Sequence, residues 1–410
     1  MTMDRRRVLS ALAAAGAVSV AGCASVEEDE NGGSGGSGDD DDDAIGEADL
    51  WYALSEGELV IVEDAIETFN DETDYAITGE DIAELEDQLT TAIPAGEGPE
   101  TFFWAHDWMG DFAESQFIAD RQDHIGVDLD QFTEAGREAV EYEGGIYGLP
   151  VSAETVALFY NEELVDDVPE TWDEFVDIME EYDGEDGMYG LSYPLDPYFY
   201  SAYAHMYGGY YFDDETGELG LTNEETLDGF RFVLEELEPY MANDPDYDAQ
   251  ASVFAEGNAP FAINGPWEFG GVDFELGVTT LPAPDGETAV PYTGIQVAYF
   301  ADAITEDDER AEAAHEFVDW YTTNLDVLEE LAREQGAIPV HEDLAGQDDL
   351  PDLVQAFSAS AANGVAMPAD PRMNQVWGPV EDGFMNAYTG EMSLEDAMAE
   401  AEDRVRDNWD

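Results

Sequence analysis

Acidic residues outnumber basic ones in this sequence far more than in an ordinary globular chain. Its 410 residues include 100 Asp and Glu against 11 basic residues, all of them arginine, so the formal net charge is −89. Such a chain repels itself in dilute buffer, and only concentrated salt, which shortens the Debye length to about 3 Å at 1 M, screens that repulsion. Because 44% of the residues are still hydrophobic, the chain can bury sizeable cores, and disorder throughout is excluded. We therefore expect a folded, acid-coated protein that works in concentrated salt.

The same imbalance limits the partners that the chain can bind. Eleven arginines cannot form a basic patch against 100 acids, so nucleic acid and anionic membrane surfaces are excluded as partners. The length suits two domains of about 100–200 residues each. Most single carboxylates are interpreted as surface groups that keep the protein soluble.

The N-terminus has the features of an export signal. Arg5-Arg6-Arg7-Val8-Leu9 fits the Arg-Arg-x-apolar-Leu pattern of a twin-arginine signal, with an ordinary basic signal peptide as the alternative. The apolar run that follows is too short to cross a bilayer core of about 30 Å. It ends at Val20-Ala21-Gly22-Cys23, which resembles a lipobox, and Cys23 is the only cysteine of the chain. We predict that residues 1–22 form a lipoprotein signal peptide and that Cys23 carries the lipid.

Residues 23–48 cannot form a core. They contain a Gly/Ser run at 32–38 and five consecutive aspartates at 39–43, which we interpret as a solvated spacer rather than a calcium site. The segment is predicted to be a tether that holds a globular body at the extracellular face of the cell membrane through the lipid alone.

The body that follows alternates short apolar runs with amphipathic segments. Strands are predicted at 50–54, 101–104 and 156–160, a hairpin at 210–221, and helices around 59–69, 311–321 and 394–405. This alternation favours an α/β fold.

Catalytic and metal-binding signatures are missing from the sequence. There is no His-Glu-x-x-His motif, no phosphate-binding loop and no intact nucleophile elbow, and the five histidines have no metal-ligand spacing. We predict neither enzyme activity nor a cofactor or metal. A glycosidase with a pair of catalytic carboxylates stays open as an alternative, because 100 acids make any single pair uninformative.

Aromatic residues gather in segments where loops are expected, namely 104–108, 196–200, 264–267 and 373–377. Aromatic faces and carboxylates together match the apolar faces and hydroxyl rims of pyranose rings. Packing in a core is the alternative for each of these aromatics.

These segments resemble the maltose-binding protein family, the solute receptors of ABC sugar importers. The resemblance covers nearly the whole body from Trp51 to the C-terminal helix, and the acidic composition resembles that of halophilic archaeal proteins. Its most specific blocks are 98–107 (GPETFFWAHD), 150–161 (PVSAETVALFYN), Pro197-Tyr198-Phe199, 263–267 (INGPW), and Met367-Pro368 followed by Trp377.

The resemblance implies a two-lobed periplasmic-binding-protein-like α/β fold with a hinge and a ligand cleft between the lobes. Lobe one is expected at residues 49–151 plus 298–346, and lobe two at 152–297 plus 347–410. A monomeric receptor that delivers maltose, maltodextrin or another oligosaccharide to ABC permease subunits is implied.

The resemblance also implies the residues of the site. Trp104, Trp267 and Trp377 match the stacking tryptophans, and Tyr198 and Phe199, after Pro197, match an aromatic pair. Asp107, Glu154 and Asp196 match carboxylates that bind sugar hydroxyls. Glu86 and Asp87 match an acidic pair at the edge of the site, and Met367 matches a packing residue near the cleft.

The sequence also departs from the family. Family positions with basic residues are here Glu56, Trp108 and Glu381, and Gly378 replaces a tyrosine. The aromatic floor is therefore expected without its basic hydrogen-bond donors, which leaves the identity of the sugar open. A surface glycosidase and a receptor for a non-sugar solute are the alternative functions.

Overall fold

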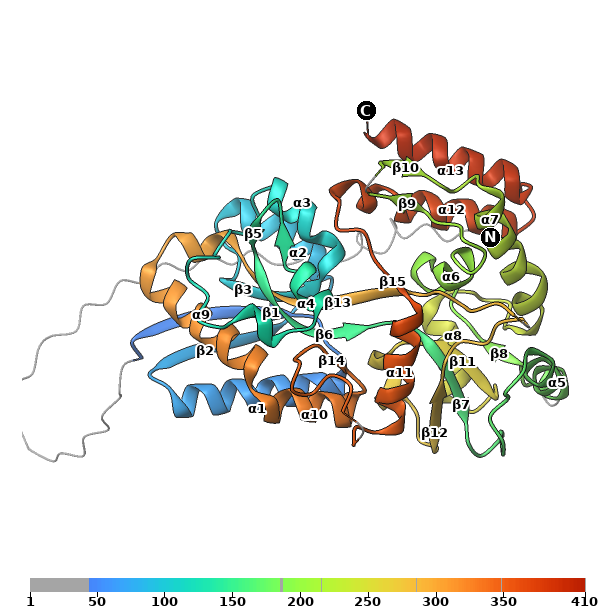
Figure 1. The fold of residues 1–410 in the computed structure, drawn as a ribbon, viewed down its shortest axis with the longest axis horizontal. Coiled ribbons are helices and arrows are strands. Elements are labelled where there is room, and N and C mark those ends of the chain that lie inside the picture. Colours follow the sequence, from blue (N-terminus) through green and yellow to red (C-terminus); the bar gives the residue numbers. More distant parts are fainter. Residues whose placement is uncertain (1–43, 185–186, 215, 285, 348, 410) are drawn as a thin grey trace, which may run out of the picture. The chain divides into compact units, whose positions relative to one another are not determined.

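The structure is a computed structural model that describes residues 44–184, 187–214, 216–284, 286–347 and 349–409. The predicted signal peptide, Cys23 and the tether up to residue 43 lie outside the described residues. From residue 43 onward the chain forms one compact unit. Figure 1 shows that this unit is built on two separate sheets, each with its own helices, which is the predicted two-lobed α/β fold.

The larger sheet has the strand order β14-β6-β13-β3-β1-β2, with β15 paired to β13. Strands β1, β2 and β3 are parallel, whereas β13 is antiparallel to both β3 and β6. Strand β1 begins at Gly46, earlier than the expected start of the body, because it pairs along its whole length with β2. The strands are β1 Gly46–Tyr52, β2 Tyr75–Asp81, β3 Thr101–Ala105, β6 Gly148–Glu154, β13 Tyr292–Phe300, β14 Ile338–Pro339 and β15 Val365–Ala366.

Amphipathic helices cover this sheet. Helix α1 buries Val62, Ala65 and Phe69, as its spacing predicts, and α9 packs along β1. Helix α1 starts at a capping box, in which the Ser55 side chain accepts from the Glu58 backbone N–H and the Glu58 carboxylate accepts from the Ser55 N–H. The helices are α1 Glu56–Glu72, α2 Leu85–Ala92, η2 Ile93–Ala95, η3 His106–Trp108, α3 Met109–Glu114, η4 Leu129–Gln131, α4 Glu134–Glu138, η8 Asp302–Thr305, α9 Asp308–Thr323 and α10 Leu325–Gln335, beside the hairpin β4 Glu141–Tyr142 and β5 Gly145–Ile146.

The smaller sheet has the order β12-β7-β11-β8. Its strands are β7 Ala157–Asn161, β8 Leu191–Ser192, β11 Phe261–Asn264 and β12 Leu276–Thr279, and the predicted hairpin is β9 Phe212–Asp213 with β10 Glu218–Leu219. Its helices are α5 Trp172–Tyr182, α6 Pro197–Ala204, α7 Glu224–Phe232, η5 Val233–Leu237, η6 Glu238–Tyr240, α8 Tyr247–Ala255, η7 Pro266–Gly271, α11 Asp352–Asn363, η9 Pro371–Gln375, α12 Trp377–Tyr388 and α13 Leu394–Trp409.

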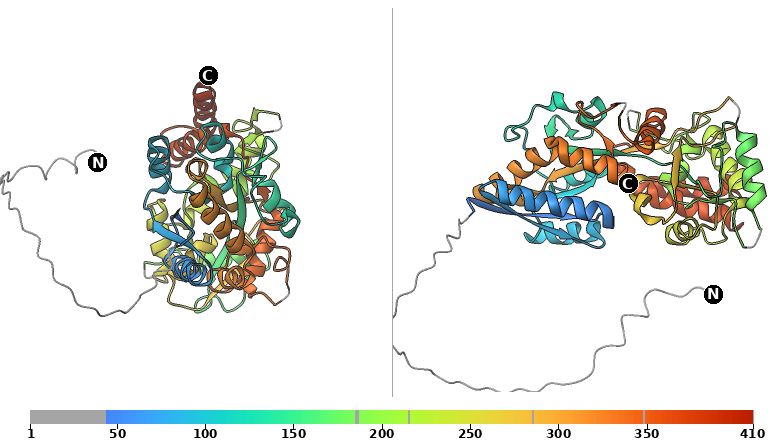
Figure 2. Two further views of the ribbon diagram at one scale, coloured as in Figure 1. Left: turned by 90° about the vertical axis from the view of Figure 1, so that its left-hand side faces the viewer. Right: turned by 90° about the horizontal axis from the view of Figure 1, so that it is seen from below.

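Each sheet has its own hydrophobic core, and a third cluster joins them. Phe102 on β3, Val297 on β13 and Phe159 on β7 belong to that shared cluster. Seen from below in Figure 2, early (blue) and late (orange) segments share one lobe, while green and red segments share the other, so the chain passes between the lobes more than once. Two of the three predicted lobe boundaries fall within the long strands β6 and β13, and the third, after residue 346, falls between β14 and α11. None of the helices in the described ranges is both long enough and apolar enough to cross a membrane.

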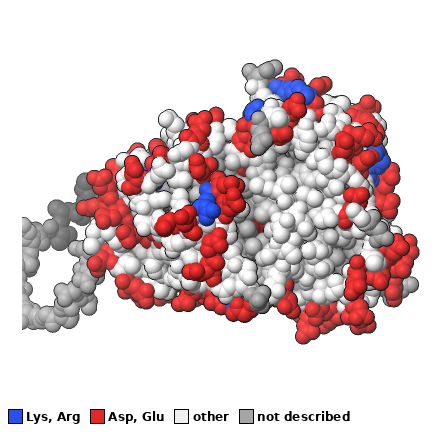
Figure 3. Space-filling view, in the orientation of Figure 1, with Lys and Arg blue, Asp and Glu red and all other residues white. Residues whose placement is uncertain are grey.

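Carboxylates cover much of the surface in Figure 3, and cationic side chains are sparse. Every arginine in the described ranges contacts a carboxylate, a backbone carbonyl or an imidazole. The few cations are therefore all used within the fold.

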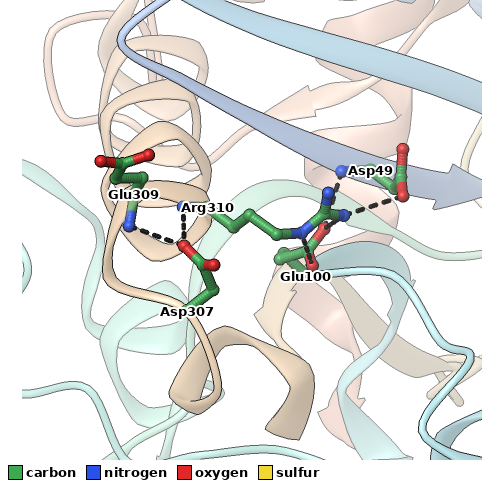
Figure 4. Close-up of polar contacts among 5 residues, drawn as sticks. All are labelled: Asp49, Glu100, Asp307, Glu309 and Arg310. Carbon is green, nitrogen blue, oxygen red and sulfur yellow. Dashed lines mark hydrogen bonds and ion pairs between the residues drawn. The ribbon is translucent and has the colours of Figure 1, made fainter.

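Arg310 on α9 holds one buried acid (Figure 4). Its Nε and one terminal nitrogen both donate to the Glu100 carboxylate, of which the side chain is 5% exposed. The same guanidinium donates to Asp49 at 2.9 Å, and the Asp49 backbone N–H donates to Glu100 at 2.8 Å. The Asp307 carboxylate caps the helix, accepting from the N–H groups of Glu309 and Arg310. This network ties α9 to β1 and to the start of β3.

Candidate functional site

One cleft collects most of the predicted site residues. It has a volume of about 280 Å³, and we call it the aromatic chamber. Its walls come from β3 and η3, from the end of β6, and from α6, η7, the segment after β15, and α12. The predicted residues that line it are Trp104, Asp107, Glu154, Asp196, Pro197, Tyr198, Trp267, Met367 and Trp377, joined by Ala105, Trp108 and Glu381.

A buried histidine fixes the turn that carries Trp104 and Asp107. His106 is 3% exposed, and burial lowers its pKa to about 4, so the imidazole is neutral at physiological pH. Its Nδ1 accepts from the Ile295 N–H at 3.0 Å, which leaves Nε2 to donate to the Met367 carbonyl at 3.2 Å. The ring therefore joins η3 to β13 and to the segment that carries Met367. His106 was not singled out from the sequence, although it stands between two predicted site residues.

Several aromatic side chains of the second lobe lie at the N-terminal ends of helices, which fix their positions in the chamber. Asp196 is the N-cap of α6, and its carboxylate accepts from the Tyr198 N–H at 2.8 Å, with Pro197 in the first helical position. This cap fixes where Tyr198 enters the chamber. The pKa of Asp196 is raised, because loss of solvent outweighs the hydrogen bonds from the Tyr198 and Phe199 N–H groups.

Trp267 is locked in place on η7. Its Nε1 donates to the Tyr247 hydroxyl at 3.0 Å, and that hydroxyl donates to the Glu268 carboxylate at 2.7 Å. Its ring folds back over Gly265, where a Cβ atom would lie 2.1 Å from Cη2 of the indole. Only glycine at position 265 leaves room for this ring.

Trp377 is the first residue of α12. Its ring meets Tyr292 edge-on at 5.7 Å and Tyr211 at 6.2 Å. Its side chain also lies close enough to Asp107 to lower the pKa of that carboxyl, so residues from both sides of the cleft meet at this end of the chamber.

Two carboxyl groups of the chamber hold their protons unusually well. Burial raises the pKa of Asp107 to about 6, and the charge of Glu86 raises it further. Interactions with its own backbone and with the Trp377 side chain lower the pKa and offset part of this rise. Burial raises the pKa of Glu154 to about 7, opposed by a hydrogen bond that Gln296 Nε2 donates at 3.0 Å. Both groups can therefore donate as well as accept hydrogen bonds near neutral pH.

Two polar atoms of chamber residues are buried without a partner among the described residues. They are Nε1 of Trp104 and the hydroxyl of Tyr198. An unsatisfied buried donor or acceptor costs about 1–3 kcal/mol, so such atoms are poised to bind the polar groups of a ligand.

Three predicted residues lie outside the chamber walls. Phe199 is buried behind the chamber, where its ring meets Trp267 edge-on at 6.2 Å. Glu86 is half-buried on α2 and reaches the site only through its charge, and Asp87 beside it is exposed. Trp108 and Glu381, which were noted as departures from the family and not as predicted site residues, also line the chamber.

The chamber has acceptors in excess and few donors. None of its lining residues is Lys, Arg or His, and its hydrogen-bond donors are indole N–H groups, the Tyr198 hydroxyl and protonated carboxyls. In the described part of the chain, no group of three or more His, Cys, Asp and Glu residues is arranged to hold a metal ion.

Comparison with known proteins gives consistent matches. Residues 55–324 match the family described as bacterial extracellular solute-binding protein. The chain is 40% identical, over 350 residues, to the maltotriose-binding protein of Pyrococcus abyssi (strain GE5 / Orsay), covering 82% of this chain and 76% of that protein. It is 23% identical to the maltodextrin-binding protein MdxE of Bacillus subtilis (strain 168), over 77% of this chain and 78% of the relative. It is 24% identical to the maltooligosaccharide ABC transporter solute-binding lipoprotein of Streptococcus pneumoniae (strain ATCC BAA-255 / R6), over 87% of both chains.

Proposed function

The chain belongs to the bacterial extracellular solute-binding protein family, and from that premise we propose that it is the receptor of an ABC importer for a malto-oligosaccharide. It acts as an extracellular sugar-binding receptor and not as an enzyme, because its family and its relatives are solute-binding proteins. The malto-oligosaccharide is our choice of ligand because three relatives carry names of that sugar class.

One observation carries the ligand assignment. Trp104 and Tyr198 lie in the same chamber, and each has a buried polar atom without a partner in the described structure. Sugar hydroxyls both donate and accept, so they satisfy an indole N–H, a phenol and the carboxyl groups of Asp107 and Glu154 together. The indole faces of Trp267 and Trp377 suit the apolar faces of the rings.

We propose that the contacts follow the predicted set, except that three of its residues, Phe199, Glu86 and Asp87, do not contact the sugar directly. Trp104, Trp267, Trp377 and Tyr198 contact the sugar rings, and the carboxyls of Asp107, Glu154 and Asp196 bind hydroxyls. Pro197 and Met367 shape the walls. Phe199 supports Trp267 from behind, and Glu86 and Asp87 act at a distance through charge. The lobes, at 49–151 plus 298–346 and 152–297 plus 347–410, would close over the ligand about β6 and β13.

Isothermal titration of maltotriose in molar salt tests this function. Trp377→Ala removes a central aromatic, for which we expect a loss of at least about 2 kcal/mol, more than tenfold in Kd. Trp320→Ala is the matched control, because Trp320 packs on Phe69 and Phe317 in the first lobe and should change stability rather than affinity. Equal affinity of Trp377→Ala and the parent would show that the site is misplaced.

We further propose that the chain is exported by a twin-arginine signal, anchored through a lipid on Cys23, and monomeric in a halophilic setting. The pattern Arg5-Arg6, the lone cysteine and the lipoprotein among the relatives support this. Replacing Cys23 with serine should release the protein from membranes in cell fractionation. A Cys23→Ser protein that stays with membranes after a high-salt wash would contradict the lipid anchor.

A further inference from the structure

Four carboxyl groups of the described structure line the aromatic chamber, and none of its lining residues is a cation. One comes from η3, one from the end of β6, one from the cap of α6 and one from α12, namely Asp107, Glu154, Asp196 and Glu381. Glu86 on α2 adds negative charge beside Asp107, whereas the neighbouring His106 is neutral. Negative charges around a space of about 280 Å³ repel one another, and a proton on one of them relieves that repulsion. The composition of the chamber therefore favours a bound proton.

Glu154 lies where this negative charge gathers. Burial is the main reason that its pKa is raised, and the charges of Asp107 on η3 and of Glu58 on α1 raise it further. From β13 it meets the neutral Gln296, and from α6 the phenol of Tyr198, of which the pKa is raised by burial and by the charge of Glu154. In the described structure, no cation is among the groups that act on Glu154. Glu154 is therefore the chamber group that binds a proton most readily.

The two carboxyl oxygens of Glu154 have different surroundings. Its Oε2 accepts from Gln296 Nε2 at 3.0 Å. Among the described residues its Oε1 has no hydrogen-bond partner, and it lies against Gly294, where an added Cβ atom would be 2.8 Å away. A proton on Oε1 therefore forms a hydroxyl group for which the described structure provides no acceptor.

A sugar needs donors that this chamber has in short supply. The ring and glycosidic oxygens of a sugar accept hydrogen bonds but cannot donate them, and an ionised carboxylate cannot donate to them either. Apart from carboxyl groups, the donors of the chamber are its indole N–H groups and the Tyr198 hydroxyl, and the N–H of Trp267 is already bonded to Tyr247. A protonated carboxyl group supplies the missing donor.

We propose that a proton is a second ligand of the aromatic chamber, and that Glu154 binds the sugar as a neutral acid whose Oε1 hydroxyl donates to an acceptor oxygen of the sugar. The inference rests on the proposed function. Each of the two ligands then strengthens the binding of the other, so the complex holds the proton more tightly than the free receptor does. The contribution of Glu154 to affinity is complete below the pKa of the free receptor, about 7, and is lost as pH rises above it.

Calorimetric titration of maltotriose in molar salt between about pH 6 and pH 9 tests this linkage. We expect the parent to bind about tenfold more weakly at the upper end of this range than at the lower end. At about pH 8 the heat of binding should depend on the ionisation enthalpy of the buffer, because the complex takes up protons. This second measurement requires no variant.

Two variants assign the proton to a residue. Glu154→Gln has an amide that donates at every pH, so its Kd should change less than about twofold over the range. Glu330→Gln, at an exposed glutamate of α10, is the matched control and should keep the pH dependence of the parent. Melting curves at each pH verify that both variants are folded.

The outcomes separate this inference from the proposed function. If the parent binds maltotriose with the same affinity at every pH and takes up no protons, the linkage is wrong while the proposed function stands. If the affinity of Glu154→Gln falls with pH as much as that of the parent, another group binds the proton and the role of Glu154 is wrong. If the parent binds no malto-oligosaccharide at any pH, the proposed function is wrong and the linkage is rejected with it.

Discussion

Replacing Gly265 with alanine should weaken sugar binding, although Gly265 itself is not among the proposed ligand contacts, because the change displaces Trp267. The added Cβ would lie 2.1 Å from Cη2 of Trp267 and 2.3 Å from Cζ3, whereas ordinary van der Waals contact begins at 3.4 Å. The indole must therefore retreat by about 1.3 Å, which is the difference between those distances. It cannot slide freely, because its Nε1 is bonded to Tyr247.

The size of the effect follows from what the indole loses. A ring displaced by more than an ångström loses its stacking geometry with the sugar, and the hydrogen bond to Tyr247 is broken or bent. A misplaced central aromatic is equivalent to its removal, so we expect maltotriose affinity to fall by about 2 kcal/mol, some thirtyfold. The melting temperature should change little, because Trp267 is only partly buried.

The assay is calorimetric titration of maltotriose with Gly265→Ala in molar salt. Gly270→Ala is a matched control on the same short helix, since a Cβ atom there meets no atom within 4 Å. Parent-like affinity in Gly265→Ala would refute the reasoning, because it would mean that the indole position observed here is not the one that binds sugar.

Three further predictions address stability. The pKa of Glu154 is raised to about 7, so the folded state holds its proton more tightly than the unfolded state, and stability falls as pH rises from the unfolded pKa toward 7. Relative to Glu154→Gln, the free energy of unfolding of the parent should fall by about 2 kcal/mol between pH 4.5 and 7, measured by urea titration. A difference between the two proteins that stays constant over this range would contradict the prediction. Arg310→Gln leaves the buried Glu100 without its cationic partner and should lower the free energy of unfolding by about 3 kcal/mol. Arg404→Gln breaks an exposed ion pair and should lower it by less than about 1 kcal/mol. Equal losses would refute the greater contribution assigned to the buried pair. The melting temperature of the parent should fall when salt drops from about 2 M to 0.05 M, where the Debye length exceeds about 10 Å, and a flat profile would show that the net charge is not what limits stability.

Sequence periodicity predicted the elements of the fold better than their ends. The spacing of Val62, Ala65 and Phe69 predicts α1 because burial on one face is a local pattern. The capping box of Ser55 and Glu58 was not anticipated, although its residues stand at the required spacing, because the helix was expected to begin only at about residue 59. Strand β1 begins before its apolar run, since its first residues gain hydrogen bonds from β2, and pairing across a sheet is not a local property.

For the site, too, the sequence could predict some residues and not others. Resemblance brought Trp104, Trp267 and Trp377 to attention, and all three line one chamber. His106 escaped it because its role depends on partners more than 180 residues away in the sequence. Single-sequence patterns cannot contain that information.

The placement of the arginines has a consequence for how this receptor responds to its surroundings. All arginines of the described ranges hold the fold together, and none lines the aromatic chamber. Capture of an uncharged sugar then uses mainly stacking and close hydrogen bonds, which dissolved ions screen far less than the repulsion between exposed carboxylates. A change in salt concentration would thus alter the stability of the receptor more than its affinity for the sugar.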